Sequence, residues 1–151
     1  MKLCLSLAFC LFLAVSLSAC GLTIEGVHYA WPVESVLNVG ADNLVEDGDH
    51  GLRFSVARIA EEEFKDTTAL RGKQIRLLQS DDGYYFIAAK GFKNVYVMKP
   101  RGGELGLKTR IEVSPIGLQD PALNQRPPYV ELVDGKSIVN LTSDGIVEGK
   151  K

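Results

Sequence analysis

The sequence predicts an all-β fold, mainly antiparallel, in which about eight short strands form a single small β-sandwich or barrel with at most one short helix. Short apolar segments recur along the chain, and turn residues separate them. No apolar stripe with helical spacing continues for long. The expected strands cover residues 33–39, 52–59, 74–78, 84–89, 94–98, 104–113, 129–133 and 137–141.

Glycine-containing turns separate several of these segments. Tight turns need residues with positive φ, a conformation that glycine adopts without strain. Such turns are predicted at Asp82-Gly83, Lys90-Gly91, Arg101-Gly102-Gly103 and Asp134-Gly135. The last of these is the clearest hairpin signal, because it stands directly between two predicted strands.

Two stretches do not fit the strand pattern. Residues 60–64, with three consecutive glutamates, form either one or two helical turns or a strand end that runs into an acidic loop. Residues 115–128 contain four prolines and are expected to form a long irregular connection.

The first residues have the pattern of an export signal. Lys2 is followed by an apolar run over residues 3–17 and then by the small residues Ser18 and Ala19. A positive start, a short apolar run and a small-residue end are typical of a secretory signal. A membrane-spanning helix needs about 20 apolar residues, and this run is shorter.

The tetrapeptide Leu17-Ser18-Ala19-Cys20 resembles the lipobox of bacterial lipoproteins, which is an aliphatic residue, two small residues and a cysteine. The resemblance implies that the Cys20 thiol receives a diacylglyceryl group and that cleavage makes Cys20 the new N-terminus. Two or more acyl chains on Cys20 would suffice for stable anchoring. By the same resemblance, Gly21 favours the outer membrane, with the domain facing the periplasm rather than the cell surface.

This interpretation divides the chain into a signal peptide (1–19), a lipidated tether (20–26) and a single β domain (27–149). Six residues, 21–26, span at most roughly 20 Å. A domain of this length has a radius of gyration of about 14 Å. The folded body is therefore expected to lie against the membrane and to meet its partners there.

Composition excludes several function classes. The net charge is −2, so no basic surface points to nucleic acid as a partner. Cys4 and Cys10 leave with the signal and Cys20 carries lipid, so the mature domain has no disulfide, thiol nucleophile or cysteine metal site.

Catalytic motifs are missing from the sequence. His28 and His50 lie far apart and do not have zinc-ligand spacing. No serine stands in a Gly-x-Ser-x-Gly elbow, and no phosphate-binding Gly-x-x-x-x-Gly-Lys occurs. A pair of carboxylates, as in glycosidases, stays open. We expect a protein that is not an enzyme and that needs no cofactor.

The acidic stretch 42–51 raises the question of calcium. Calcium takes six to eight oxygen ligands. Asp47 and Asp49 are two residues apart, but Gly51 and Arg58 stand where an EF-hand loop needs a further ligand and its closing glutamate. A solvated hairpin loop is the preferred interpretation.

Four residues are candidates for binding a partner or ligand. Residues 84–89 and their expected hairpin mate 94–98 are apolar on both faces, which favours a central strand pair covered on both sides. Alternatively one face is a binding surface, and then Tyr85 and Tyr96 would contact the partner. Arg126 and Tyr129 flank Pro127-Pro128, which is expected to follow a polyproline-like path. Both are residue types common at interface anchors, although the loop would also serve as a rigid approach to a strand.

The expected function is a membrane-anchored envelope lipoprotein that acts as a non-catalytic accessory module for another envelope protein. The alternative is a periplasmic carrier of a small ligand or lipid, with a cavity inside a barrel. An envelope hydrolase is the third hypothesis.

Overall fold

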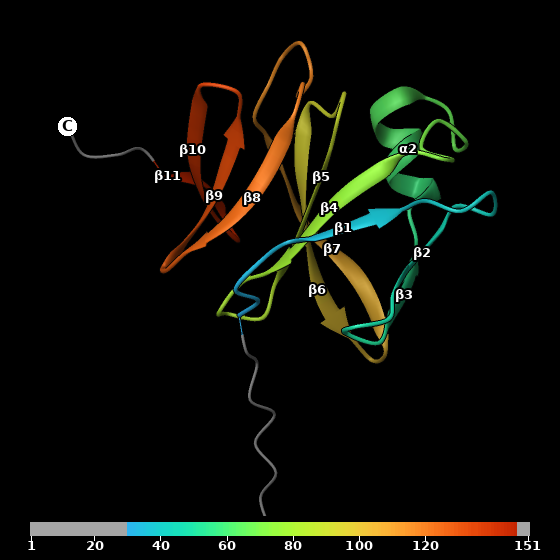
Figure 1. The fold of residues 1–151 in the computed structure, drawn as a ribbon, viewed down its shortest axis with the longest axis horizontal. Coiled ribbons are helices and arrows are strands. Elements are labelled where there is room, and N and C mark those ends of the chain that lie inside the picture. The colour runs from blue at the N-terminus through green and yellow to red at the C-terminus, as the bar shows by residue number, and fades with distance from the viewer. Residues whose placement is uncertain (1–29, 148–151) are drawn as a thin grey trace, which may run out of the picture.

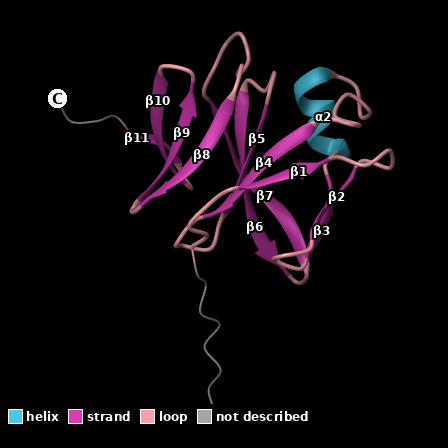
Figure 2. Ribbon diagram, in the orientation of Figure 1, coloured by secondary structure: helices cyan, strands magenta, loops and turns pink. Residues whose placement is uncertain are grey.

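The computed structural model describes residues 30–147, which form eleven strands and one helix (Figures 1 and 2). The strands of the N-terminal half are β1 (Ser35–Asn38), β2 (Leu44–Asp47), β3 (Leu52–Ser55), β4 (Gln74–Gln79) and β5 (Tyr85–Ala89). Those of the C-terminal half are β6 (Asn94–Arg101), β7 (Glu104–Glu112), β8 (Pro121–Arg126), β9 (Tyr129–Asp134), β10 (Ser137–Thr142) and β11 (Gly145–Val147). The helix is α2 (Ala57–Phe64).

The strands form three antiparallel sheets, which confirms the all-β prediction. The central sheet has the order β1-β4-β5-β6-β7, the second has β11-β10-β9-β8, and β2 pairs with β3. Each order has two ends, so the architecture is sandwich-like rather than a closed barrel. In Figure 1 the β8–β11 sheet and the layer of α2 with the β2–β3 hairpin lie on opposite sides of the central sheet.

The central strand pair is covered on both sides, as the sequence predicted. All five residues of β5 are buried, and β5 pairs with β6 in the register Tyr85↔Met98 and Ile87↔Tyr96. On one side β8 contacts β4 and β5. The buried apolar side chains of the sheets and of α2 form a single cluster, so residues 30–147 share one core.

The clearest predicted hairpin is present. Asp134 and Ser137 are paired across the β9–β10 turn, and Gly135 has a φ of 61°. A side chain at this φ is strained, which explains why glycine stands there.

Three strands were not predicted, so residues 30–147 contain eleven strands rather than about eight. β8 lies inside the stretch expected to be an irregular connection, and that expectation was wrong. Pro121 is the first residue of this sheet-edge strand, the place where a missing backbone N–H is tolerated. The polyproline-like path was also wrong, because Arg126 pairs with Tyr129 and the chain reverses at Pro127-Pro128.

The helix resolves the alternatives for residues 60–64 and corrects the strand predicted at 52–59. β3 ends at Ser55 and α2 begins at Ala57. Val56, Ile59, Ala60 and Phe64 are the side chains that pack into the core. Their spacing of three, four and eight residues places them on one side of a helix. Among residues 30–147, no helix is long and apolar enough to cross a membrane.

Candidate binding groove

A groove of about 900 Å³ opens between the β3–α2 segment and the face of the central sheet formed by β5, β6 and β7. Its floor consists of side chains that alternate along these three strands: Tyr85, Ile87, Tyr96, Met98, Leu105 and Leu107. Its wall consists of apolar side chains of the hairpin and helix: Leu52, Phe54 and Ile59. The β2–β3 hairpin and α2 thus cover only part of this sheet face.

The floor becomes more accessible from β5 toward β7. Ile87 is fully buried and Tyr96 is 1% exposed, Met98 and Leu105 are half-buried, and Leu107 is 42% exposed. The gradient arises because the two-stranded hairpin is too narrow to reach over β7. The apolar surface that a partner could reach is therefore that of β6 and β7.

Tyr85 and Tyr96 do line the groove, although both are buried at its inner part. The Tyr96 hydroxyl donates a hydrogen bond of 3.0 Å to Oε1 of Glu63. Burial, and after it the negative charge of Glu63, raises the pKa of Tyr96, so this phenol stays a neutral donor. Its polar end is engaged within the domain, and Leu105 and Leu107, which sequence reasoning missed, are the more accessible residues.

A bulge in the β6–β7 pair limits the groove along β7. The register shifts between Val97 and Met98, which leaves Lys108 without a partner residue on β6. The Lys108 ammonium lies 4.3 Å from the ring centre of Tyr84 and 2.8 Å from Oδ1 of Asp144. The hydrogen bond with Asp144 raises the pKa of Lys108. The part of β7 after Leu107 is therefore tied to the β10–β11 turn, whereas the part before it is open.

Two arginines, Arg53 and Arg58, and two glutamates, Glu62 and Glu104, line the groove. Glu62, a residue of α2, is contacted by Arg58 Nε at 3.3 Å and by Arg110 Nη1 at 3.4 Å. Arg53 lies 3.0 Å from Glu46 across the outer face of the hairpin. The side chains of Arg53 and Arg58 are 64% and 85% exposed. Each guanidinium therefore already has one carboxylate partner, and its other N–H donors stay open to a binding partner.

An aromatic stack lies beside the groove, next to its floor residue Tyr85. The Trp31 and His50 rings lie 3.6 Å apart at 14°, and Tyr85 meets Trp31 edge-on at 5.7 Å. His50 Nδ1 lies 2.8 Å from Oδ2 of the buried Asp47. Burial tends to raise the pKa of Asp47, but the Ser35 hydroxyl and His50 together hold this pKa below its ordinary value. This cluster joins the start of the described chain to the tip of the β2–β3 hairpin.

The stretch 42–51 is a real hairpin, but it is less solvated than expected. It contains β2, and the carboxylate of Asp47 accepts hydrogen bonds from the backbone N–H groups of Asp49 and His50. Within residues 30–147, no group of three or more acidic, histidine or cysteine side chains is arranged to hold a metal ion. His28 lies outside the described residues.

The four predicted binding residues fall into two separate pairs. Tyr85 and Tyr96 lie on the central sheet, whereas Arg126 and Tyr129 face each other across the β8–β9 turn of the second sheet. Arg126 is exposed, and its Nε lies 3.6 Å from Oε1 of Glu131. The structure does not bring the two pairs into one site. Cys20 lies outside the described residues.

The chain matches no protein-family model, no curated protein and no solved structure.

Proposed function

We propose that this chain is a lipid-anchored protein of the bacterial envelope and that its β domain binds another envelope protein, without catalysing a reaction. The observation that carries the binding function is the open apolar groove beside β3. Apolar surface that stays reachable next to charged residues is typical of interaction sites. The anchoring rests on the lipobox-like residues Leu17-Ser18-Ala19-Cys20.

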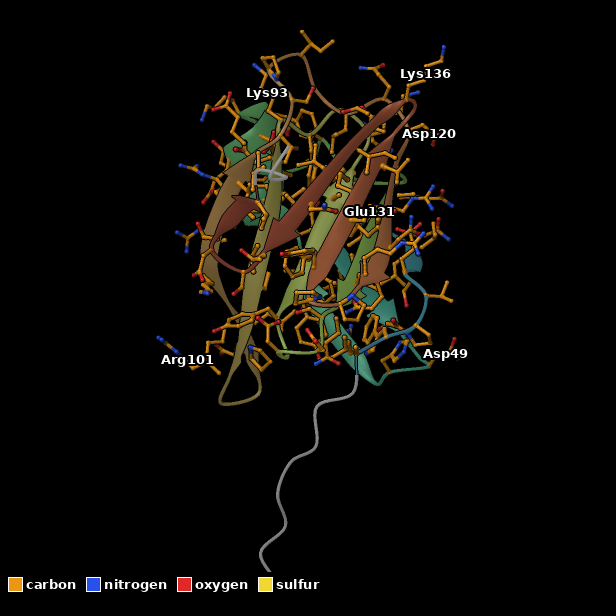
Figure 3. The ribbon with its side chains drawn as sticks, turned by 90° about the vertical axis from the view of Figure 1, so that its left-hand side faces the viewer. Asp49, Lys93, Arg101, Asp120, Glu131 and Lys136 are labelled. Carbon is orange, nitrogen blue, oxygen red and sulfur yellow. The ribbon has the colours of Figure 1, made fainter. Side chains whose placement is uncertain are left out.

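The position of the groove supports binding close to the membrane. The described chain begins at Ala30, so residues 21–29 separate it from Cys20 by at most roughly 30 Å. The β2–β3 turn near Asp49 and the β6–β7 turn near Arg101 lie at the same end of the molecule as this start (Figure 3). A lipid on Cys20 would therefore hold one end of the groove near the bilayer, with the outer membrane and its periplasmic side as the favoured location.

The chemistry of the groove favours a protein segment over a small carried molecule. A carrier encloses most of its ligand's surface. Here Leu105 is half-buried, Leu107 is exposed, and the strand order of the central sheet does not close. The polar groups of Glu62, Glu63 and Tyr96 already have hydrogen-bond partners within the domain. The floor therefore offers apolar contact area rather than polar groups that would orient a small ligand.

Crosslinking in cells tests this proposal. The tagged full-length chain is crosslinked, and copurifying proteins are identified by mass spectrometry. We expect one dominant envelope protein, which is lost with Leu107→Asp because a carboxylate then lies on the apolar floor. Ile138→Asp is the matched control, since Ile138 is an exposed apolar residue of β10, away from the groove.

The anchor is tested in the same experiment. Cys20→Ser should release the protein from the membrane fraction and also reduce recovery of the partner. Equal recovery from wild type and Leu107→Asp would remove the groove from the proposal. A partner that is recovered equally with Cys20→Ser would remove the need for the anchor.

A further inference from the structure

We infer that the groove binds an extended segment of its partner, which adds to β3 as a third, antiparallel strand and alternates apolar with acidic residues. This inference rests on the proposed function and specifies the kind of partner. Strand addition to an exposed sheet edge is a common mode of peptide recognition, in which the backbone gives affinity and the side chains give specificity.

The backbone of β3 has one free edge. Within residues 30–147, β3 pairs only with β2. The Val56 N–H donates to the carbonyl of Asn43 at 3.0 Å, which fixes the phase of the ladder. Because hydrogen-bonded and non-bonded pairs alternate in antiparallel strands, Leu52 and Phe54 bond to β2. The N–H and C=O groups of Arg53 and Ser55 consequently point away from β2, along the open edge.

An added strand would complete the cover of the central sheet. β2 contacts β1 at one edge of this sheet, and β3, the second strand of the pair, lines the groove together with β5, β6 and β7. A third strand, about 4.8 Å from β3, would lie over Met98, Leu105 and Leu107. Every second side chain of that strand would point to the floor, which requires apolar residues at those positions.

The other side chains of the added strand would meet positive charge. Directly paired residues in antiparallel strands point to the same face, so the residue opposite Arg53 shares its outward side. Arg53 and Arg58 are both largely exposed, and each contacts a single carboxylate, that of Glu46 or Glu62, through its Nε. Glu62 is already held by two arginines, and Glu104 lies at the β6–β7 turn end of the groove. Acidic residues therefore complement the outward positions.

The pairing predicts which amides of a bound peptide are essential. Arg53 has its backbone groups at the free edge and its side chain outward, so its hydrogen-bonded partner also points outward and is acidic. The N–H groups of the acidic residues then bond to β3, whereas those of the apolar residues point away. Methylation of the first set blocks the pairing, and methylation of the second set leaves it intact.

The test uses fluorescent peptides of about seven residues that alternate valine and glutamate, titrated by anisotropy against the full-length chain in detergent. We expect saturable binding, and at least about tenfold weaker binding when the glutamate amides are N-methylated, because hydrogen bonds are lost. Methylation of the valine amides should change the affinity by no more than about twofold. No binding of the parent peptide, or equal effects of the two methylation patterns, overturns strand addition.

Further experiments test whether the outward residues of the bound strand are acidic and whether the strand comes from a partner. Arg53→Glu should weaken the valine–glutamate peptide and favour a valine–lysine peptide, while Arg126→Glu, an exposed site on β8, should have no effect. If Arg53→Glu still prefers the valine–glutamate peptide to the valine–lysine peptide, the acidic part of the inference is overturned.

An unlabelled peptide of residues 21–29, in which Leu22 and Ile24 alternate with polar residues, serves as competitor. If it displaces the probe more strongly than the parent peptide does, the groove belongs to the chain's own N-terminal segment and the partner is overturned.

The two proposals fail in different ways. Loss of the crosslinked partner with Leu107→Asp, together with indifference to amide methylation, leaves the partner-binding function in place and removes strand addition. If methylation of the glutamate amides alone weakens peptide binding but no protein is crosslinked in cells, strand addition stands and the envelope-protein partner is contradicted.

Discussion

The two faces of the central sheet have similar apolar composition but different covers. On one face, Phe86 and Val97 lie beneath the four-stranded sheet and are no more than 1% exposed. On the other, a narrow hairpin and a two-turn helix bury Ile87 and Tyr96 but leave Leu107 open. The candidate site is therefore defined by the limited width of the covering layer rather than by unusual residues on the floor.

The largest expected effect is on the sealed face. Phe86→Ala removes a large buried side chain between two sheets that cannot both relax, so it should lower the free energy of unfolding by about 3–5 kcal/mol. Chemical denaturation of the full-length chain in detergent measures this loss. A loss below about 1 kcal/mol would show that the two sheets are not tightly packed there.

Asp47 makes the Trp31–His50 cluster beside the groove sensitive to acid. Its pKa in the folded protein is lower than the ordinary 3.8, so its ionised form stabilises the fold above that pH. The stabilisation should disappear as the pH falls from about 4 through the lowered pKa. Asp47→Asn should lose about 1.5–3 kcal/mol at pH 7 and show a weaker dependence of the melting temperature on acid. An unchanged acid dependence in this variant would assign it to other carboxylates.

Tyr96→Phe separates the two roles of the groove floor. The hydroxyl bonds to Glu63, which also accepts the Lys93 N–H and the Asn94 amide, so its removal should cost about 1 kcal/mol of stability. Partner recovery and peptide affinity should not change, because the hydroxyl points into the domain. A strong loss of binding at unchanged stability would give Tyr96 the direct contact that its residue type suggested.

The smallest effect on stability is expected at the open face. Leu107→Ala should change the free energy of unfolding by no more than about 0.5 kcal/mol, because much of the side chain is exposed. It should nevertheless weaken the binding of the valine–glutamate peptide. A large loss of stability would mean that Leu107 belongs to the core, and the contrast between the two faces would disappear.

Most strands could be predicted because alternation and glycine turns are local signals. β2 was missed because its residues Leu-Val-Glu-Asp include two acids. The carboxylate of Asp47 can be buried because it pairs with His50, which follows the strand and stacks on Trp31, a residue of another segment. β8 was missed because proline argues against a strand, and the sequence does not reveal which strands lie at an edge. The start of α2 was assigned to a strand because Val56 and Ile59 are β-branched.

The site was less predictable than the fold. Alternation correctly placed Tyr85 and Ile87 on one face and Phe86 on the other, but it carries no information about how wide the covering layer is. Burial of Tyr85 and Tyr96 agrees with the favoured prediction of a strand pair covered on both sides, whereas the opening over Leu107 could not be foreseen. Arg126 and Tyr129 were singled out by residue type, and their distance from the groove depends on sheet pairing, which is a long-range property.

The Trp31–His50 stack beside the groove also has a spectroscopic consequence. The chain has a single tryptophan, and the structure places Trp31 against an imidazole and beside a floor residue of the groove. Its emission therefore comes from one known position. Changes in that emission would report whether the hairpin is seated and whether the groove is filled, in the unlabelled protein and in a membrane.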